Sequence, residues 1–321
     1  MAGCTTNGGI KMAKLAEQLE RKAFSAAIDV ALRRINKDRE KGLLEIVDLT
    51  EKFMGDNFTK EAYEGARAMI KNPDHKWMRY VNRLLDETDP HVAKMTALNL
   101  GYQAAFYGTK TIRKMREVHD CNIPWLILMD PTSACNLHCT GCWAAEYGHK
   151  LNLTFEELDS IVTQGKELGI YFYMMTGGEP LVRKADVIKL CEKHNDVAFH
   201  CYTNGTLIDQ AFCDEMKRVG NLSLSISLEG FEDTNDFRRG DGVYAKVLHA
   251  MDLLHENGLL FGNSVCYTRK NMDAVTSDEF FDLLIEHGSR FAWYFHLMPV
   301  GMDASPELMP TKEQREYIYH R

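Results

Sequence analysis

The spacing of apolar residues divides the chain into two parts with different periods. Up to about residue 120, apolar residues recur at intervals of three and four, which is typical of amphipathic helices. Five segments show this spacing: 14–37, 42–54, 59–71, 76–87 and 91–117. No strand is predicted between them, so we expect residues 1–120 to form an all-helical N-terminal domain.

From residue 121 to about 310, short runs rich in β-forming residues alternate with amphipathic helices. Six runs predict strands: 125–132, 170–177, 197–204, 221–230, 259–268 and 291–300. Helices are predicted between them at 154–169, 185–194, 209–219, 244–257 and 277–287. This alternation indicates parallel βαβ units, and therefore a doubly wound sheet or a barrel.

The fourth predicted strand favours a barrel. In NLSLSISL (221–228), leucine and isoleucine alternate strictly with Ser223, Ser225 and Ser227. If the apolar side chains face covering helices, the serines point to the other side, into the barrel. The interior of a filled barrel prefers bulky branched side chains, so serines there indicate a cavity that holds a polar ligand. The alternative is an edge strand with its serine face in water.

Residues 311–321 begin a further helix, in which Thr311 and Gln314 predict a capping box. No C-cap or stop signal follows before Arg321. We therefore expect the start of a C-terminal helix, in a chain of which a further part is missing.

Charge and composition narrow the class of partner. The 321 residues include 38 basic and 46 acidic ones, a formal net charge of −8. Phosphate binding depends on clustered lysine and arginine, so no nucleic-acid partner is expected. The sequence contains no signal peptide and no run of the ~18 apolar residues that span a bilayer, so we expect a cytoplasmic protein. In that reducing compartment, closely spaced cysteines indicate a metal site or catalysis more than disulfides.

Three of the nine cysteines lie within eight residues, in CNLHCTGC (135–142). Cys135, Cys139 and Cys142 follow the first predicted strand, where βα enzymes place their chemistry. Three thiolates bind three irons of a [4Fe–4S] cube and leave the fourth iron without a protein ligand. An open coordination site is typical of a catalytic metal. The alternative is a zinc site completed by His138, His149 or Cys121.

A Gly-Gly-Glu-Pro sequence at 177–180 follows the second predicted strand, at the same end of the barrel. Gly177 and Gly178 allow the backbone to approach a ligand closely, and the carboxylate of Glu179 can receive an ammonium group. On its own, this sequence predicts only a turn at Pro180. Because it follows an incomplete cysteine triplet by one βα unit, the two motifs together are a much more specific signal than either motif alone.

With these two motifs the sequence resembles the radical S-adenosylmethionine (SAM) superfamily. The resemblance extends through YTNGTL (202–207), SISLEG (225–230) and FRRGDGVY (237–244), and covers about 125–310. It implies a partial (β/α)6 TIM-like barrel over 121–310. It also implies that the three cysteines bind a [4Fe–4S] cluster, that SAM chelates the open iron, and that the Gly-Gly-Glu-Pro motif contacts the SAM amino group.

The resemblance assigns further residues to SAM. Thr203 or Asn204, after the third strand, and Ser227, in the fourth, would lie near the ribose. Arg238 would pair with the SAM carboxylate; the alternatives are a simple turn at Asn204 and a solvated loop at Arg238.

Two positions depart from the family pattern. Gly141 stands where an aromatic residue is common, and Glu229 stands where relatives carry the Asp of S-x-D-G. Glu229 keeps the negative charge, whereas Gly141 offers no ring against the adenine.

The implied chemistry is radical chemistry. One electron passes from the reduced cluster to SAM, which is cleaved to methionine and a 5′-deoxyadenosyl radical that takes hydrogen from the substrate. A one-electron donor such as flavodoxin or ferredoxin is implied as a partner. His200, Tyr202, Tyr294 and His296 have the alternation to reach the cavity, and we expect core or supporting roles for them.

Only the resemblance to known families indicates the class of substrate. YFHLMPVG (294–301) resembles the last barrel strand of the SPASM/twitch group, whose C-terminal extension carries auxiliary clusters and whose members commonly modify peptides or proteins. We therefore expect a peptide or protein substrate.

Two alternatives stay open. One is a lipid substrate at a membrane, because 91–117 joins an apolar, small-residue face to a basic end and would lie on an anionic surface. Packing on the barrel, with the basic end favoured by the helix dipole, is the preferred explanation of that helix. The other alternative is a non-catalytic zinc-binding module.

Overall fold

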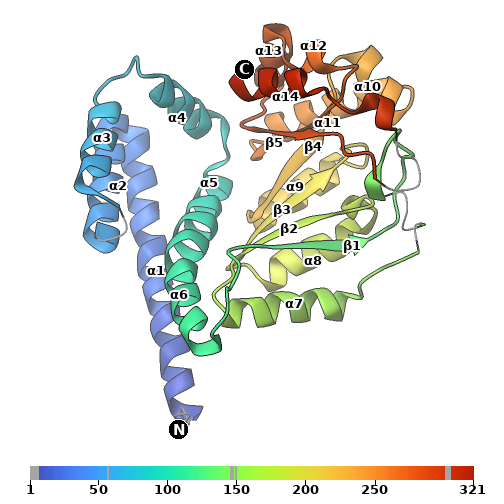
Figure 1. Ribbon diagram of the computed structural model, residues 1–321. Coiled ribbons are helices and arrows are strands. Elements are labelled where there is room, and N and C mark those ends of the chain that lie inside the picture. The colour runs from blue at the N-terminus through green and yellow to red at the C-terminus, as the bar shows by residue number, and fades with distance from the viewer. Residues whose placement is uncertain (1–6, 56–57, 145–147, 149, 301–304) are drawn as a thin grey trace.

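Helices form the N-terminal part, as predicted. The structure is a computed structural model that describes residues 7–55, 58–144, 148, 150–300 and 305–321 (Figure 1). Within these ranges, six α-helices and one π-helix precede the first strand: α1 (Asn7–Lys37), α2 (Arg39–Met54), α3 (Lys60–Ile70), α4 (Lys76–Glu87), α5 (Pro90–Thr96), η2 (Ala97–Gly108, the π-helix) and α6 (Thr109–His119). Side-chain caps explain where several begin: Asp38 caps α2, Thr59 caps α3 and Asp89 caps α5, each accepting a hydrogen bond from a first-turn N–H.

The helical segment from Pro90 to His119 is one continuous rod whose middle is wound as a π-helix. Several of its apolar side chains are buried, with Leu98, Tyr102, Ala104 and Ile112 at most 5% exposed, whereas Val118 near its end is 64% exposed. The buried side chains lie between α1 and the barrel, so packing accounts for the face that the sequence also allowed for a membrane surface (Figure 1). Among the described residues, none of the helices combines the length and apolarity that crossing a bilayer requires.

The second part is an α/β structure whose described residues form six parallel strands. They are β1 (Ile127–Thr132), β2 (Phe172–Gly177), β3 (Ala198–Thr203), β4 (Leu222–Ser227), β5 (Phe261–Tyr267) and β6 (Ala292–His296), and they pair in that order. The helices among them are α7 (Phe155–Glu167), α8 (Lys184–Lys193), α9 (Gln210–Val219), α10 (Glu232–Arg239), α11 (Val243–Glu256), α12 (Met272–Val275) and α13 (Asp278–Glu286), with short 3₁₀ turns η4 (Pro180–Arg183) and η5 (Pro306–Leu308). The capping box of Thr311 and Gln314 is formed, and it begins α14 (Lys312–His320).

The sheet is curved into part of a barrel. Neighbouring strands lie about 4.8 Å apart, so β3 and β6, with two strands between them, would be separated by roughly 14 Å in a flat sheet. Instead, Tyr202 on β3 and Phe295 on β6 have ring centroids 6.1 Å apart, and His200 and Phe291 have theirs 5.9 Å apart. Their side chains meet because the inner faces of the two strands turn toward each other. The partial (β/α)6 barrel is therefore confirmed.

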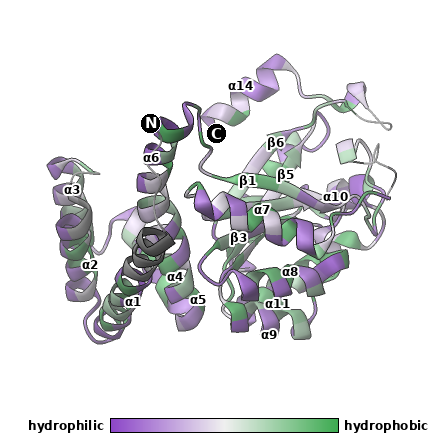
Figure 2. Cartoon of the chain, turned by 90° about the horizontal axis from the view of Figure 1, so that it is seen from below, coloured by the Kyte–Doolittle hydropathy of each residue, from purple (hydrophilic) through white to green (hydrophobic). Residues whose placement is uncertain are grey.

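The core lies between the outer face of the sheet and the helices that follow one another along it (Figure 2). On β4, Leu222, Leu224 and Ile226 are at most 3% exposed and belong to this core. Each such side chain contributes roughly 1.5–3 kcal/mol by leaving water. Ser223 and Ser225 point to the opposite, inner face, where both hydroxyls hydrogen-bond His200, so the predicted orientation of the serine row is confirmed.

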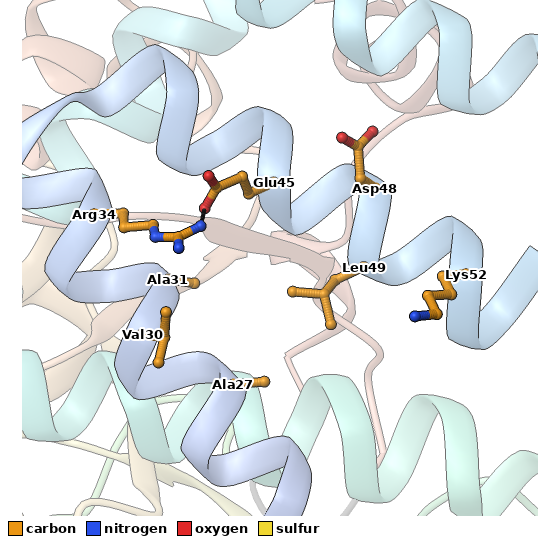
Figure 3. A pocket seen from close by; sticks show the side chains of 8 residues that line it. All are labelled: Ala27, Val30, Ala31, Arg34, Glu45, Asp48, Leu49 and Lys52. Atoms are coloured by element: carbon orange, nitrogen blue, oxygen red, sulfur yellow. Dashed lines mark hydrogen bonds and ion pairs between the residues drawn. The ribbon is translucent and has the colours of Figure 1, made fainter.

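A hollow between α1 and α2 lies in the helical part (Figure 3). Ala27, Val30, Ala31 and Leu49 line it with apolar groups, and an ion pair joins Arg34 of α1 to Glu45 of α2 beside it. Its lining residues belong to α1 and α2 alone, so it is separate from the ends of the strands, where the site described next is found.

Candidate functional site

The three predicted cysteines lie in the loop that follows β1. Cys135, Cys139 and Cys142 are partly exposed, form no disulfide and line one cavity together with Gly178. Within the described ranges, no three His, Cys, Asp or Glu side chains converge on the position of a single metal ion. His149, which the zinc alternative named, lies outside the described residues. Ligands of a cluster each hold a different iron and need not converge on one point, so three thiols around one cavity fit a [4Fe–4S] cube.

Hydrogen bonds from β3 hold the first half of the cysteine loop. Asn204, at the end of β3, donates from Nδ2 to Asn136 Oδ1 at 2.9 Å, and the same Nδ2 lies 4.0 Å from Cys135 Sγ. Asn136 in turn donates to Thr206 Oγ1 at 2.8 Å. Asn204 therefore faces the cysteine loop rather than solvent.

The second half of the loop is held by α10, a helix that the sequence analysis did not predict. The backbone N–H of Thr140 donates to the carbonyl oxygen of Arg238 at 2.8 Å. Nη1 of Arg239 lies 3.8 Å from Cys139 Sγ. The segment 237–239 is thus a helix end in contact with the cysteines and not a solvated loop.

The glycines of the Gly-Gly-Glu-Pro motif allow the loop after β2 to lie against the cysteine loop. Gly177 has φ +107°, which side chains rarely tolerate, and a Cβ on Gly178 would overlap the carbonyl oxygens of Ala134 and Ser133. The N–H of Glu179 donates to the carbonyl oxygen of Ala134 at 2.7 Å. Pro180 follows as the first residue of η4.

The carboxylate of Glu179 is buried and fully engaged within the chain. It accepts hydrogen bonds from Leu181 N at 2.9 Å, Thr203 Oγ1 at 2.8 Å and Asn204 N at 2.7 Å. Burial raises the pKa of this carboxyl, although the three hydrogen bonds oppose the shift. Glu179 and Thr203 therefore join the ends of β2 and β3, and the backbone of the motif faces the cysteine cavity.

Glu229 forms a buried cluster with Arg238 and Arg239. Its carboxylate is completely buried; Arg238 Nη1 donates to Oε1 at 3.1 Å, Arg239 Nη2 donates to Oε1 at 2.8 Å, and Arg239 Nε binds Oε2. Burial disfavours the charged form, yet the two guanidinium groups hold the pKa of Glu229 below its ordinary value. Arg238, predicted to bind the SAM carboxylate, thus has an internal partner, while its Nε is buried without a hydrogen bond among the described residues.

Ser227 stands at the end of β4, level with Ser264 of β5. It is partly exposed, and its alternation with Ser223 and Ser225 places it on the inner face.

Burial raises the pKa of the Cys135 and Cys139 thiols, so binding of a metal cluster there has to release protons.

The inner face of the sheet differs in part from expectation. His200 is buried between Ser223 Oγ (2.8 Å) and Ser225 Oγ (2.9 Å), and burial lowers its pKa to about 4. Tyr294 does not reach the cavity: its hydroxyl donates to the carbonyl oxygen of Val275 in α12, on the outer side.

Instead of Tyr294, its neighbours Trp293 and Phe295 face inward, at 44% and 46% exposure. The strict alternation of β6 could have shown this, had the facing of one residue been known. His296 shares the outer register position of Tyr294.

Two residues were missed by the sequence analysis. Asp130, on the inner face of β1, is exposed, and its carboxylate lies close to Gly177 without an ion pair among the described residues; desolvation by the surrounding protein raises its pKa. Arg183 donates to Pro131 O at 2.7 Å and to Leu153 O, and pairs with Asp186, so it fixes both ends of the segment that contains the cysteines. Neither residue belongs to a short motif.

Comparison with known proteins agrees with this arrangement. The family model of the Radical SAM superfamily matches residues 129–285. The AdoMet-dependent heme synthase of Methanosarcina barkeri is 28% identical over 201 residues, covering 60% of this chain and 57% of the relative. The GTP 3',8-cyclase of Alkaliphilus oremlandii is 32% identical over 203 residues, covering 59% of this chain and 61% of the relative.

Solved structures share the fold. SuiB of Streptococcus suis bound to precursor peptide SuiA has a TM-score of 0.55 at 17% identity, covering 80% of this chain and 59% of that chain. A structure of anSMEcpe with bound AdoMet and a peptide has a TM-score of 0.50 at 20% identity, covering 59% of this chain and 55% of that one.

The chain spans between 55 and 61% of the length of these four relatives. Both motifs and five of the six described strands lie within the matched residues 129–285 or reach into them, and the solved structures share the fold. Residues 129–285 of this chain thus match the Radical SAM superfamily, whose members are enzymes that bind a [4Fe–4S] cluster and SAM.

Proposed function

We propose that this chain is the catalytic core of an enzyme that cleaves SAM reductively and uses the resulting radical on a peptide or protein. The observation that carries the proposal is the cavity lined by Cys135, Cys139, Cys142 and Gly178 at the carboxyl ends of parallel strands. The three cysteines would hold a [4Fe–4S] cluster, and such a cluster, once reduced, would supply the electron for cleavage of SAM to methionine and a 5′-deoxyadenosyl radical that takes hydrogen from the substrate. We assign residues 121–310 to this core, 1–120 to a helical domain and 311–321 to a C-terminal helix.

The roles of the surrounding residues follow from where they lie. The three cysteines would hold the cluster, and the backbone at Gly177 and Gly178 would face the amino group of SAM. Glu179, Pro180 and Thr203 would keep that backbone in place. Asn204, Ser227 and Arg238 would contact the remainder of SAM. The cysteines lie in the loop after β1, and the other residues lie at the ends of β2, β3 and β4 or on α10.

The chain's own contribution is to hold the reactants and keep water from the radical. Trp293, Phe295 and Tyr202 supply large apolar surfaces on the inner face of the barrel, and the serine row of β4 supplies hydroxyl groups. This mixture suits a substrate with both apolar and polar parts, as a peptide has. The peptide-bound SuiB and anSMEcpe structures support the same class.

We infer that a one-electron donor of the flavodoxin or ferredoxin type reduces the cluster. None of the eight described cysteines forms a disulfide, which suits a reducing compartment such as the cytoplasm.

Anaerobic reconstitution with iron and sulfide tests the proposal. We expect a brown protein that contains about four irons per chain, as a [4Fe–4S] cluster requires, and that releases 5′-deoxyadenosine from SAM when dithionite is added. Cys139→Ala should lower this release by at least about 100-fold, because one iron loses its ligand. Liquid chromatography with mass spectrometry measures the product.

Cys121→Ala is the matched control, because Cys121 is an exposed thiol outside the cysteine triplet. It should retain both cluster and cleavage. A colourless wild-type protein with stoichiometric zinc would support the zinc-binding alternative and end the proposal. Offering heme precursors, nucleotides and peptides to the reconstituted enzyme, and measuring which one increases 5′-deoxyadenosine release, identifies the substrate class.

A further inference from the structure

Arg239 is a cation that the chain holds in contact with a cluster cysteine. Its guanidinium has three nitrogens, and all three have a partner: Nε and Nη2 bind the two oxygens of Glu229, and Nη1 lies 3.8 Å from Cys139 Sγ. The side chain is 9% exposed and Glu229 is completely buried. A two-point ion pair of this kind fixes the plane of the guanidinium, so the third nitrogen is aimed at the sulfur.

Arg238, the neighbouring arginine, differs from Arg239 in its contact with cysteine sulfur. It belongs to the same helix, is 11% exposed and pairs with the same carboxylate through Nη1 at 3.1 Å. Among the described contacts, its guanidinium donates to Glu229 and to no cysteine sulfur. The two arginines thus have the same charge, burial and anionic partner, and only Arg239 reaches a sulfur in the described part of the chain.

The backbone of α10 reinforces the contact. Thr140, next to Cys139, donates its N–H to the carbonyl oxygen of Arg238 at 2.8 Å. The end of α10 and the cysteine loop are therefore held in register, and the Arg239–Cys139 contact does not depend on a mobile surface side chain.

Resting on the cluster assignment above, we propose that the Glu229–Arg239 pair sets the reduction potential of the cluster by directing one N–H of Arg239 at the Cys139 sulfur. Reduction adds one electron, taken from the external donor, and makes the cluster more negative by one charge. A hydrogen bond from a cation to a cluster sulfur stabilises that more negative form, so it raises the potential. Arg239 is a positioning residue in this role, since it acts through the ligand Cys139.

A spectroscopic redox titration of the reconstituted full chain, without SAM, tests the proposal. In Arg239→Gln the ratio of reduced to oxidised cluster at a fixed potential should fall at least tenfold, which corresponds to about 59 mV for a one-electron couple. Arg238→Gln removes the same charge one residue away, and we expect a clearly smaller shift. Electron paramagnetic resonance of the reduced cluster gives the ratio independently of catalytic activity.

A second variant keeps the test valid if Arg239→Gln folds poorly, because that change leaves the buried Glu229 with only Arg238. Glu229→Gln/Arg239→Gln removes the ion pair without changing the net charge. It should show the same downward shift, since the directed N–H is lost. Circular dichroism and iron content confirm that each variant is folded and loaded.

The outcomes separate this inference from the proposed function. If wild-type protein binds no cluster, the proposed function fails and the inference with it. If the cluster forms in every variant and the Arg239→Gln potential equals that of wild type, only the inference is wrong. Equal shifts in Arg239→Gln and Arg238→Gln would also overturn it, because they would show a general charge effect without a directed contact.

Discussion

For single residues, the structure explains side chains whose chemistry the sequence left open. His200 is an example: it has the residue type of a catalytic base, yet both ring nitrogens bind serine hydroxyls and the ring packs against Tyr202 at 5.2 Å. Burial lowers its pKa to about 4, so it is neutral near pH 7. Its contacts assign it to holding β3 and β4 together on the inner face.

The lowered pKa of His200 predicts a pH dependence of stability. The unfolded chain binds this proton more tightly than the folded one, so the free energy of unfolding should fall as the pH drops from about 6.5 towards 4. Between pH 7 and pH 5 the loss is about 2 kcal/mol. His200→Gln keeps an amide that can bond both serines but cannot titrate.

Urea unfolding of wild type and His200→Gln at both pH values measures this loss. The variant should lack about 2 kcal/mol of the decline seen in wild type. Identical pH dependence in the two proteins would show that His200 is already solvated in the folded state.

Among the structural elements, close backbone approach connects the two motifs. The loop after β2 lies on the loop after β1, and Gly178 is the point of nearest contact with Ala134 and Ser133. The sequence showed that glycine allows such an approach but did not show what is approached. In the structure, the segment that Gly178 approaches is the cysteine loop.

Gly178→Ala should therefore disturb the cysteine loop. The added methyl overlaps two backbone carbonyl oxygens that cannot rotate away, at a cost of about 1–3 kcal/mol. We expect the iron content after reconstitution to fall by more than half, while the helical circular dichroism stays close to that of wild type.

Gly65→Ala is the matched control for this substitution. Gly65 lies inside α3, and a methyl group added there would meet no atom within 4 Å outside the backbone of its own helix. Alanine at this position should stabilise the helix by about 1 kcal/mol. Normal iron content in Gly178→Ala would mean that the cysteine loop tolerates displacement.

Across the whole molecule, a cluster of charges joins the helical part to the barrel. Glu87, the last residue of α4, accepts hydrogen bonds from Arg83 Nε at 2.7 Å and from Arg290, and lies 2.9 Å from His255 Nε2. Arg290, just before β6, has a side chain only 4% exposed. Desolvation alone would raise the pKa of Glu87, but its bonds to Arg290 and Arg83 outweigh it and lower the pKa to about 2.

Glu87→Gln should destabilise the protein by about 2 kcal/mol at pH 7, because the buried Arg290 loses its counter-charge. The folded pKa lies below the ordinary 4.5, so the contribution is present above about pH 4.5 and is lost as the pH falls towards 2. The difference between wild type and variant in urea unfolding should therefore shrink across that range.

Asp86→Asn is the neighbouring control. Asp86 pairs with Arg39, is 60% exposed and should change stability by less than about 1 kcal/mol. If both substitutions cost the same, the charge cluster does not join the two parts.

Local pattern accounts for what could be predicted of the fold. The helices α2 to α4 and all six described strands lie within a few residues of their predicted ranges, whereas α1 begins earlier than predicted, at Asn7. The short helix α10 was missed because its polar sequence, EDTNDFRR, has no apolar stripe. Its importance comes from the contacts that its end makes with Glu229, after β4, and with Cys139, which lies a hundred positions from Arg239 in the sequence.

The amino-acid sequence alone specifies the period of each element, the parallel alternation and the loops that carry the cysteines and glycines, because all of these depend on neighbours within a few positions. The contacts between those loops, in contrast, join residues that are distant in the sequence, so only the tertiary structure decides them. Through such contacts, the Glu179 carboxylate accepts a hydrogen bond from Thr203 of β3, and Arg239 lies against Cys139. They also place Tyr294 on the outer side of β6 and Trp293 on the inner side. The physical reason is that a hydrogen bond or ion pair requires atoms to lie within about 3–4 Å, and chain folding brings together residues a hundred positions apart or more.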